Sequence, residues 1–224
     1  MTFSIVARCA KTGQFGMTVA SSSPAVAARC AYARAGVGAA ASQNVTDPRL
    51  GPAALDQLAA GLDAGAALDA VIGAAEHAEY RQLLIVDRYG NTAIHSGGKS
   101  LGIHTEHAAR DVAAAGNLLA NDTIPRAMVE AFLSSEGHLG DRLITAMRGA
   151  LAAGGEAGPV HSAGMLLVDR QDWPLAELRC DWSEDCPIEN IAAAWDVYKP
   201  QMDDYVTRAL DPSAAPSYGV PGDE

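Results

Sequence analysis

The first 23 residues constrain the fold most, because they form the pattern of a complete β-hairpin that starts at the beginning of the chain. Residues 2–8 alternate between two faces, a period of two that is typical of a half-buried strand. One face carries Phe3, Ile5 and Ala7, and the other carries Ser4, Val6 and Arg8. Residues 11–13 form a turn signal, and residues 15–20 resume the apolar strand pattern. We therefore expect the chain to enter a β-sheet at once, without a leader segment.

Thr2 is a candidate nucleophile because of its place at the start of this strand. A small second residue normally allows the initiator Met1 to be removed, and Thr2 would then carry both a hydroxyl and a free α-amine. That amine is a base that can activate the hydroxyl without help from another side chain. The simpler interpretation is that Thr occupies position 2 for Met processing alone. The first 23 residues leave both interpretations open.

Charge and hydropathy exclude several classes of partner. The chain has 224 residues, a formal net charge of −11 and a pI of about 4.9. Nucleic acid and an anionic membrane surface are therefore not expected as partners, because no basic patch is available to neutralise phosphates. Apolar stretches end well short of the roughly 18–20 residues that a membrane-spanning helix needs. These features predict a cytoplasmic protein.

No cofactor or metal is expected. The four cysteines lack CxxC spacing and are predicted to be reduced thiols. Neither GxGxxG nor GxxxxGK[ST] occurs, and there is no GxSxG nucleophile motif. His104 and His107 would suit a metal if their segment were helical, but they lack a third ligand.

The rest of the chain predicts alternating groups of strands and helices. Residues 26–32 fit a short helical turn or an irregular strand, and residues 99–112 are expected to be a surface connection. Strands are predicted at residues 35–44, 81–86, 92–98, 112–119, 162–169 and 176–181. Helices are predicted from residue 52, and at residues 66–78, 126–133, 139–153 and 188–210, with Pro200 ending or kinking the last one.

This order predicts an α+β fold with four layers. Two mostly antiparallel sheets would face each other, with a helix layer on each outer side, as an αββα sandwich. We find no internal linker, so residues 1–210 are predicted to form one domain, followed by a Pro-, Ser- and Gly-rich tail at residues 211–224. Strand edges and an Ala-rich surface favour a homo-oligomer, with a dimer as the first expectation.

Three residues are candidate donors to a developing oxyanion. Asn117 lies within a small, apolar strand, and Gly97 and Gly98 would let a substrate approach their backbone amides closely. The alternatives are that Asn117 is a buried amide that pairs a sheet edge, and that the glycines form a plain turn after a strand.

Further polar residues are candidate substrate contacts. Gln43 and Asn44 leave a buried strand together, so that they could bind a small polar ligand or cap a loop. Arg81 could clamp a carboxylate, although pairing with Glu76, Glu79 or Asp87 is the favoured interpretation. The remaining candidates are Ser21, as a wall residue or a strand-end hydroxyl, and His95, for which a structural role is favoured over catalysis.

Several segments together resemble the DUF1028 family. They are MTFSIVAR at the start, VAS at residues 19–21, ARAGVGA at 33–39, YRQL at 80–83, IVD at 85–87, and GN followed by Leu119 at 116–119. The segments are spread over most of residues 1–170, in the order and at the spacing of the family. Residues 156–159 (Glu-Ala-Gly-Pro) differ from the Asp-Arg-Arg-type stretch of many relatives, which argues against an anionic substrate.

The resemblance implies a fold similar to that of the N-terminal nucleophile (Ntn) hydrolases, and a family whose function is not established. In Ntn enzymes the end of the first strand supplies the nucleophile, and Thr2 is the residue that matches. The resemblance therefore implies a hydrolase for an amide, cyclic amide or imide of a small molecule. The alternatives are a non-catalytic module that binds a small ligand or assembles, or an enzyme that uses the cleft without the free amine.

Overall fold

The computed structural model describes residues 1–221 and contains two antiparallel sheets. The larger sheet has six strands in the order β10-β9-β2-β1-β8-β7, so that the first hairpin of the chain lies at its centre. Its strands are β1 (Thr2–Arg8), β2 (Phe15–Ser21), β7 (Thr105–Ala109), β8 (Val112–Asn117), β9 (Ser162–Val168) and β10 (Ala176–Cys180). The smaller sheet runs in the order β3-β4-β5-β6, with β3 (Ala31–Arg34), β4 (Gly38–Asn44), β5 (Arg81–Asp87) and β6 (Thr92–Ser96).

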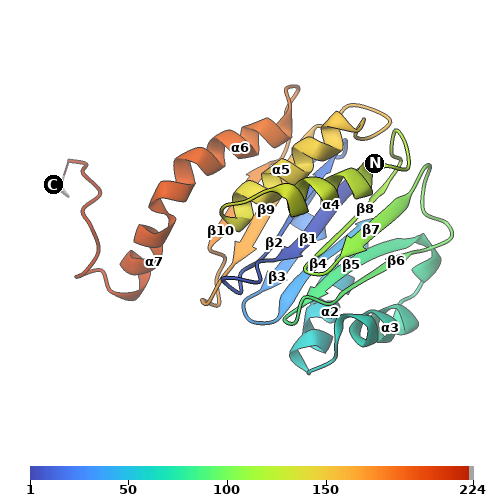
Figure 1. The fold of residues 1–224 in the computed structure, drawn as a ribbon, viewed down its shortest axis with the longest axis horizontal. Coiled ribbons are helices and arrows are strands. Elements are labelled where there is room, and N and C mark those ends of the chain that lie inside the picture. The colour runs from blue at the N-terminus through green and yellow to red at the C-terminus, as the bar shows by residue number, and fades with distance from the viewer. Residues whose placement is uncertain (222–224) are drawn as a thin grey trace.

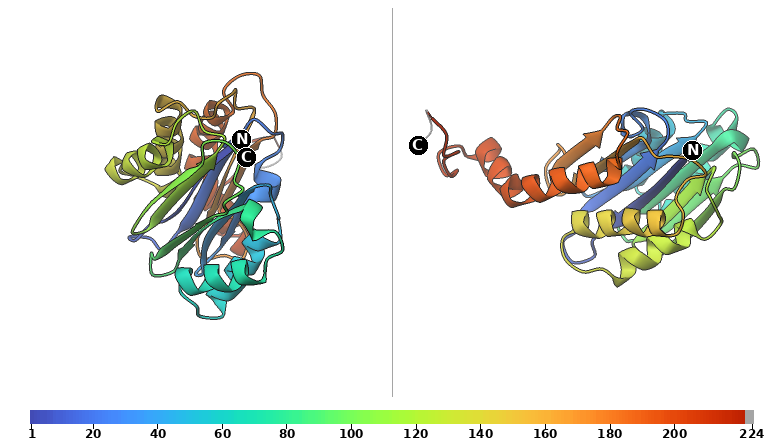
Figure 2. Two further views of the ribbon diagram at one scale, coloured as in Figure 1. Left: turned by 90° about the vertical axis from the view of Figure 1, so that its right-hand side faces the viewer. Right: turned by 90° about the horizontal axis from the view of Figure 1, so that it is seen from above.

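Helices cover the outer face of each sheet (Figures 1 and 2). On the six-stranded sheet lie α4 (Ile124–Ser134), α5 (Leu139–Ala152) and α6 (Pro187–Tyr198). On the four-stranded sheet lie α2 (Leu50–Ala59) and α3 (Ala64–Ala74). The predicted four-layer αββα sandwich, the arrangement of an Ntn-hydrolase-like fold, is confirmed.

The alternation of β1 divides the core. Phe3 and Ile5 pack with the helices above the six-stranded sheet, in a cluster that also contains the fully buried Trp195. Val6 points to the opposite face and packs between the sheets, where Ala and Val side chains of β4, β5 and β8 meet it. Around Val6 this layer is built from small side chains, and larger ones such as Phe15 and Met17 fill it elsewhere. Ser4 and Thr2 lie on the Val6 face.

The surface connection predicted for residues 99–112 is wrong in part, because it contains the edge strand β7. β7 pairs only with β8, and the side chains of residues 106–108 are exposed. An exposed edge strand needs no apolar alternation, and its polar side chains discourage pairing with another chain. The pattern that identifies buried strands was therefore missing.

Two further segments show how local sequence limits each element. Residues 26–32 contain both of the structures expected there, because α1 (Ala27–Cys30) leads directly into β3. The closing helix is interrupted as predicted at Pro200: α6 passes through the 3₁₀ turn η2 (Lys199–Gln201) into α7 (Met202–Leu210). α7 extends away from the sandwich (Figure 1). The division into residues 1–210 and 211–224 stays a prediction, and residues 222–224 lie outside the described residues.

Candidate functional site

The layer between the sheets becomes polar at the end where β1 begins. Thr2 is opposite Asn117 of β8, and Ser21 of β2 lies on the other side of Thr2. All three side chains are buried, with exposed fractions of 7%, 1% and 0% in the order Thr2, Asn117, Ser21. Three neighbouring strands of one sheet therefore supply a group of buried hydroxyl and amide groups. The cluster joins the sequence-predicted candidates Thr2, Asn117 and Ser21.

Two hydroxyls of this cluster converge on one carbonyl oxygen. Thr2 Oγ1 donates to the carbonyl of Met1 at 2.5 Å, and Ser21 Oγ donates to the same oxygen. The two hydroxyl oxygens are 3.3 Å apart. Ser21 Oγ also accepts the amide N–H of Ser23 at 3.1 Å, which fixes its orientation. The carbonyl oxygen at the start of β1 is thus held between two hydroxyl donors.

A pair of buried glutamines from the opposite sheet supports the cluster. Gln43 and Gln82, on adjacent strands β4 and β5, are both fully buried. Gln43 Oε1 accepts the hydroxyl of Ser4 at 2.6 Å, and Gln43 Nε2 donates to Gln82 Oε1 at 2.7 Å. Gln82 Oε1 also accepts from Asn117 Nδ2 at 3.3 Å. The two sheets are therefore joined by a chain of hydrogen bonds that ends on Asn117. The bond from Asn117 to Gln82 uses only one of the two N–H groups of the Asn117 amide.

Glu156 adds a buried carboxyl group beside the start of the chain. It follows α5, is 5% exposed and pairs with Leu119 in an isolated β-bridge. Its Oε2 accepts the amide N–H of Ser22 at 3.0 Å, while its buried Oε1 has no hydrogen-bond partner within the described residues. Burial raises the pKa of Glu156 to about 7, although the N-terminal ammonium and Ser22 act in the opposite direction. This carboxyl group is therefore partly protonated near neutral pH.

The loop after Glu156 forms a wall beside Met1. A Cβ placed on Gly158 would lie 3.0 Å from the Cε atom of Met1, so the Met1 side chain packs closely against this glycine. Residues 154–160 with residues 184–187 line a cavity of about 280 Å³, in which the charged side chains are Glu156, Glu184 and Asp185. The cavity is acidic throughout.

Other sequence-predicted candidates lie in a neighbouring group of loops and make no hydrogen bond to Thr2, Ser21 or Asn117 within residues 1–221. Asn44 ends β4 with a positive φ of 77° and donates to the carbonyl of Tyr80 at 2.6 Å, which is the loop-capping role. His95 Nε2 lies 2.9 Å from the carbonyl of Ala78, which fits the structural role.

Two predictions for this group need correction. Arg81 forms no ion pair with a carboxylate of the described chain; its Nη1 donates to the carbonyl of Val45 instead, because β5 begins beside the loop after β4. The amide of Gly97 donates to the carbonyl of Arg81 at 2.9 Å, so it is not available to an oxyanion. Gly98 has open space where a Cβ would lie, and no donor role is assigned to it.

The condition under which His104 and His107 would suit a metal, a helical segment, is not met. His104 precedes β7 and His107 lies within that strand, so their side chains do not share a helical face. Nowhere in residues 1–221 do three or more His, Cys, Asp or Glu side chains gather as a group that could hold a metal ion. Within the same residues, no helix is both long enough and apolar enough to cross a membrane.

Sequence reasoning missed Ser4, Gln82 and Glu156. Gln82 had a signal in the period-two pattern, because it shares the inward face with Leu84 and Val86 and is the polar exception there. Ser4 had the same signal beside Val6. Glu156 had none, because only the tertiary fold brings the loop after α5 to the start of β1.

The chain is thus an αββα sandwich whose first strand begins among buried hydroxyls. Residues 2–191 match the family described as "Family of unknown function (DUF1028)", and the chain belongs to this family. The crystal structure of protein SPO2555 from Silicibacter pomeroyi, also a DUF1028 protein, is 29% identical and has a TM-score of 0.82. That match covers 88% of this chain and 89% of SPO2555.

Anbu (ancestral beta-subunit) from Yersinia bercovieri is a more distant structural match, with 11% identity and a TM-score of 0.40 over 90% of this chain and 96% of Anbu. No match was found among curated proteins.

Proposed function

We propose that this protein is an Ntn-type hydrolase that cleaves a C–N bond in an amide, cyclic amide or imide of a small molecule, with Thr2 as nucleophile after removal of Met1. The observation that carries this proposal is the pair of hydroxyls, Thr2 Oγ1 and Ser21 Oγ, which reach the same carbonyl oxygen at the buried start of the central strand. An acyl group in that place has its oxygen held by Ser21 and its carbon next to the nucleophile.

In the proposed reaction, the α-amine of Thr2 takes the proton of Oγ1 as the oxygen attacks the carbonyl carbon. An α-amine has a typical pKa of about 7.7–8.0, which suits a base near neutral pH. The negative charge on the former carbonyl oxygen is stabilised by Ser21 Oγ and by the second N–H of Asn117, and one such donor typically contributes about 3 kcal/mol. The C–N bond then breaks as the ammonium returns its proton to the leaving nitrogen. Water hydrolyses the Thr2 ester and restores the enzyme.

Gln43 and Gln82 act as positioning residues in this proposal. Gln82 Oε1 accepts from Asn117, and Gln43 fixes the orientation of the Gln82 amide by donating to the same oxygen at 2.7 Å. Because a preorganised donor needs no rotation during the reaction, this arrangement favours the charged intermediate.

Glu156 and the acidic cavity beside it bear on the kind of substrate. A buried carboxyl with an unpaired oxygen disfavours a second negative charge nearby. The absence of basic side chains from the lining of that cavity has the same effect. We therefore assign neutral or cationic substrates to this site. This agrees with the sequence of residues 156–159, which lacks the arginines that many relatives have in that stretch.

The test starts from a fusion protein whose processing protease leaves Thr2 as the first residue. This protein is treated with a β-lactone, which acylates nucleophilic hydroxyls, and the adduct is located by peptide mass spectrometry. Thr18→Ala is the matched control, because Thr18 is a buried threonine of the adjacent strand whose hydroxyl has no partner within the described chain. The expected result is an adduct on Thr2 in the parent and in Thr18→Ala, and none in Thr2→Ala. An unmodified Thr2 would overturn the proposal.

The alternative is a non-catalytic module on the same fold that binds a small ligand or assembles. One observation favours it: Met1 packs against Gly158 and its carbonyl occupies both hydroxyl donors, so a chain that keeps Met1 has no free amine at Thr2. The intact mass of untagged protein from native cells decides the point. A mass that includes Met1 supports the module, and a mass that lacks it supports the hydrolase. The expected homo-oligomer is tested on the same sample by light scattering.

A further inference from the structure

A second cavity lies at the opposite end of β1 from Thr2. Thr2 begins this seven-residue strand and Arg8 ends it, which places the two ends about 20 Å apart. The cavity has a volume of about 430 Å³ and is formed by the end of β1, the turn after it, the β7–β8 turn, and the α4–α5 connection with the start of α5. Its size is in the range of small-molecule sites.

The charge of this cavity is opposite to that of the whole chain. Four of the 16 basic residues line it, namely Arg8, Lys11, Arg110 and Arg142, against two carboxylates, Asp111 and Glu136. The lining therefore carries a formal charge of +2, whereas the whole chain has a net charge of −11. This cavity thus has a local excess of positive charge in an acidic chain.

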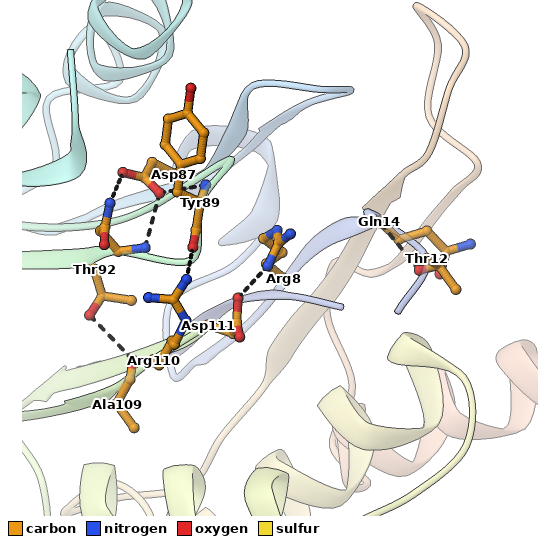
Figure 3. Close-up of polar contacts among 10 residues, drawn as sticks. Arg8, Thr12, Gln14, Asp87, Tyr89, Thr92, Ala109, Arg110 and Asp111 are labelled. Atoms are coloured by element: carbon orange, nitrogen blue, oxygen red, sulfur yellow. Dashed lines mark hydrogen bonds and ion pairs between the residues drawn. The ribbon is translucent and has the colours of Figure 1, made fainter. Parts of the chain in front are cut away.

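Most of these cations lack a carboxylate partner. Arg8 is paired with Asp111 at 2.8 Å (Figure 3). Arg110 donates to the backbone carbonyl of Tyr89, as Figure 3 also shows, and forms no ion pair within residues 1–221. The ammonium group of Lys11 has no ion-pair partner in the same residues. Two exposed cationic side chains without a carboxylate partner in the described chain thus lie at the rim.

Arg142 supplies a fixed cation at the inner wall. Its guanidinium lies 3.9 Å from the ring centroid of Phe132 and donates through Nη2 to the carbonyl of that residue at 3.2 Å. Its Nε atom is buried and has no hydrogen-bond partner in the described chain. A guanidinium that is held on an aromatic ring with free N–H groups is preorganised to bind an anion in a bidentate way.

Cys9 lies in the wall of the same cavity. Burial raises the pKa of its thiol, but hydrogen bonds from Thr12 and Lys11, together with the charge of Arg142, outweigh burial and lower it. A lowered thiol pKa means that negative charge is stabilised at this wall. The backbone and side-chain donors around Cys9 therefore add to the basic residues that line the cavity.

We propose that the cavity at the Arg8 end of β1 is a binding site for a small organic anion, whose carboxylate or phosphate is held by Arg142, Lys11 and Arg110. The apolar part of the ligand rests against Leu133, which is 53% exposed at the mouth of the cavity. This site is separate from the Thr2 cluster, and the proposal does not depend on hydrolase activity. A ligand in this site contacts both the central strand and the α4–α5 connection.

Binding is measured by titration calorimetry with phenylphosphate and phenylacetate, and with benzylamine as a cation of similar shape. The double variant Lys11→Met/Arg110→Met removes both rim cations, and each of these side chains is exposed, so the fold is retained. Arg126→Met is the matched control, because Arg126 is an exposed arginine of α4 that does not line the cavity. A second measurement follows alkylation of Cys9 by iodoacetamide with peptide mass spectrometry.

At least one of the two anions is expected to bind and to slow alkylation of Cys9, whereas benzylamine does neither. The Kd should rise about tenfold in the double variant, since each charge-assisted contact contributes appreciably to affinity, and less than about twofold in Arg126→Met. The inference is overturned if neither anion binds, if benzylamine binds as tightly as the anions, or if the double variant and Arg126→Met have the same Kd.

Discussion

The buried carboxyl group of Glu156 predicts a pH-dependent loss of stability that can be calculated. Its pKa is raised to about 7 in the folded chain, compared with the ordinary glutamate pKa of 4.5 that applies to the unfolded chain. Because the folded pKa is the higher one, the folded state binds more protons than the unfolded state between these two values. Stability then falls as pH rises through this range. The difference between these two pKa values corresponds to roughly 3 kcal/mol in total.

Glu156→Gln removes this titration and keeps an oxygen that can accept the amide N–H of Ser22. The free energy of unfolding is measured in urea from pH 5.5, which is above the pI of about 4.9, to pH 8.5. The variant should gain about 2 kcal/mol relative to the parent protein over this interval, which is the part of the shift above pH 5.5. The exposed Glu130→Gln is the control for a change of surface charge, and it should show no such trend. A difference between Glu156→Gln and the parent that stays constant with pH would refute the reasoning.

Two further predictions concern buried contacts of the four-stranded sheet. Gln82→Met should lower the free energy of unfolding in urea by about 2–4 kcal/mol, since it leaves the buried amide of Asn117 unpaired. The double variant Gln43→Met/Gln82→Met should lose less than the sum of the two single losses. Strict additivity would show that the glutamines act independently. Gly38→Ala should lower stability by about 1–3 kcal/mol, because its Cβ would lie 2.3 Å from the carbonyl oxygen of Val86. Gly98→Ala, with open space at the same atom, should be nearly neutral by thermal unfolding, and equal losses in both glycine variants would contradict this view.

The layers of the fold could be predicted from the sequence because most buried elements carry a periodic apolar pattern. The alternation of residues 2–8 correctly separated the helix-facing side from the inter-sheet side. β7 escaped prediction because its stability comes from pairing with β8 along one edge, and not from burying an apolar face. The loop near Asn44 likewise depends on partners that are distant in sequence, such as Tyr80.

Residues of the candidate site could be predicted only where a polar residue lay at or near the end of a predicted strand. Four candidates were found in this way: Thr2, Ser21, Asn117 and Gln43. The hydroxyls of Thr2 and Ser21 form one group, and Gln82 joins Gln43 to Asn117 in a second, neighbouring group. The role of a polar residue inside a strand depends on the sheet that it faces, which a single sequence does not give.

The order of strands in the six-stranded sheet has a consequence for how this protein is made. The four-stranded sheet and its helices come from one continuous segment, but the central hairpin β1–β2 finds its neighbours β8 and β9 only more than a hundred residues later. At about 5–20 residues per second, the ribosome needs roughly 10–30 s to supply them. During that time the first hairpin exposes apolar side chains on both faces. We therefore expect nascent chains that end before β9 to need chaperones and to aggregate when released. Chains that include β8 and β9 can complete the six-stranded sheet around the β1–β2 hairpin.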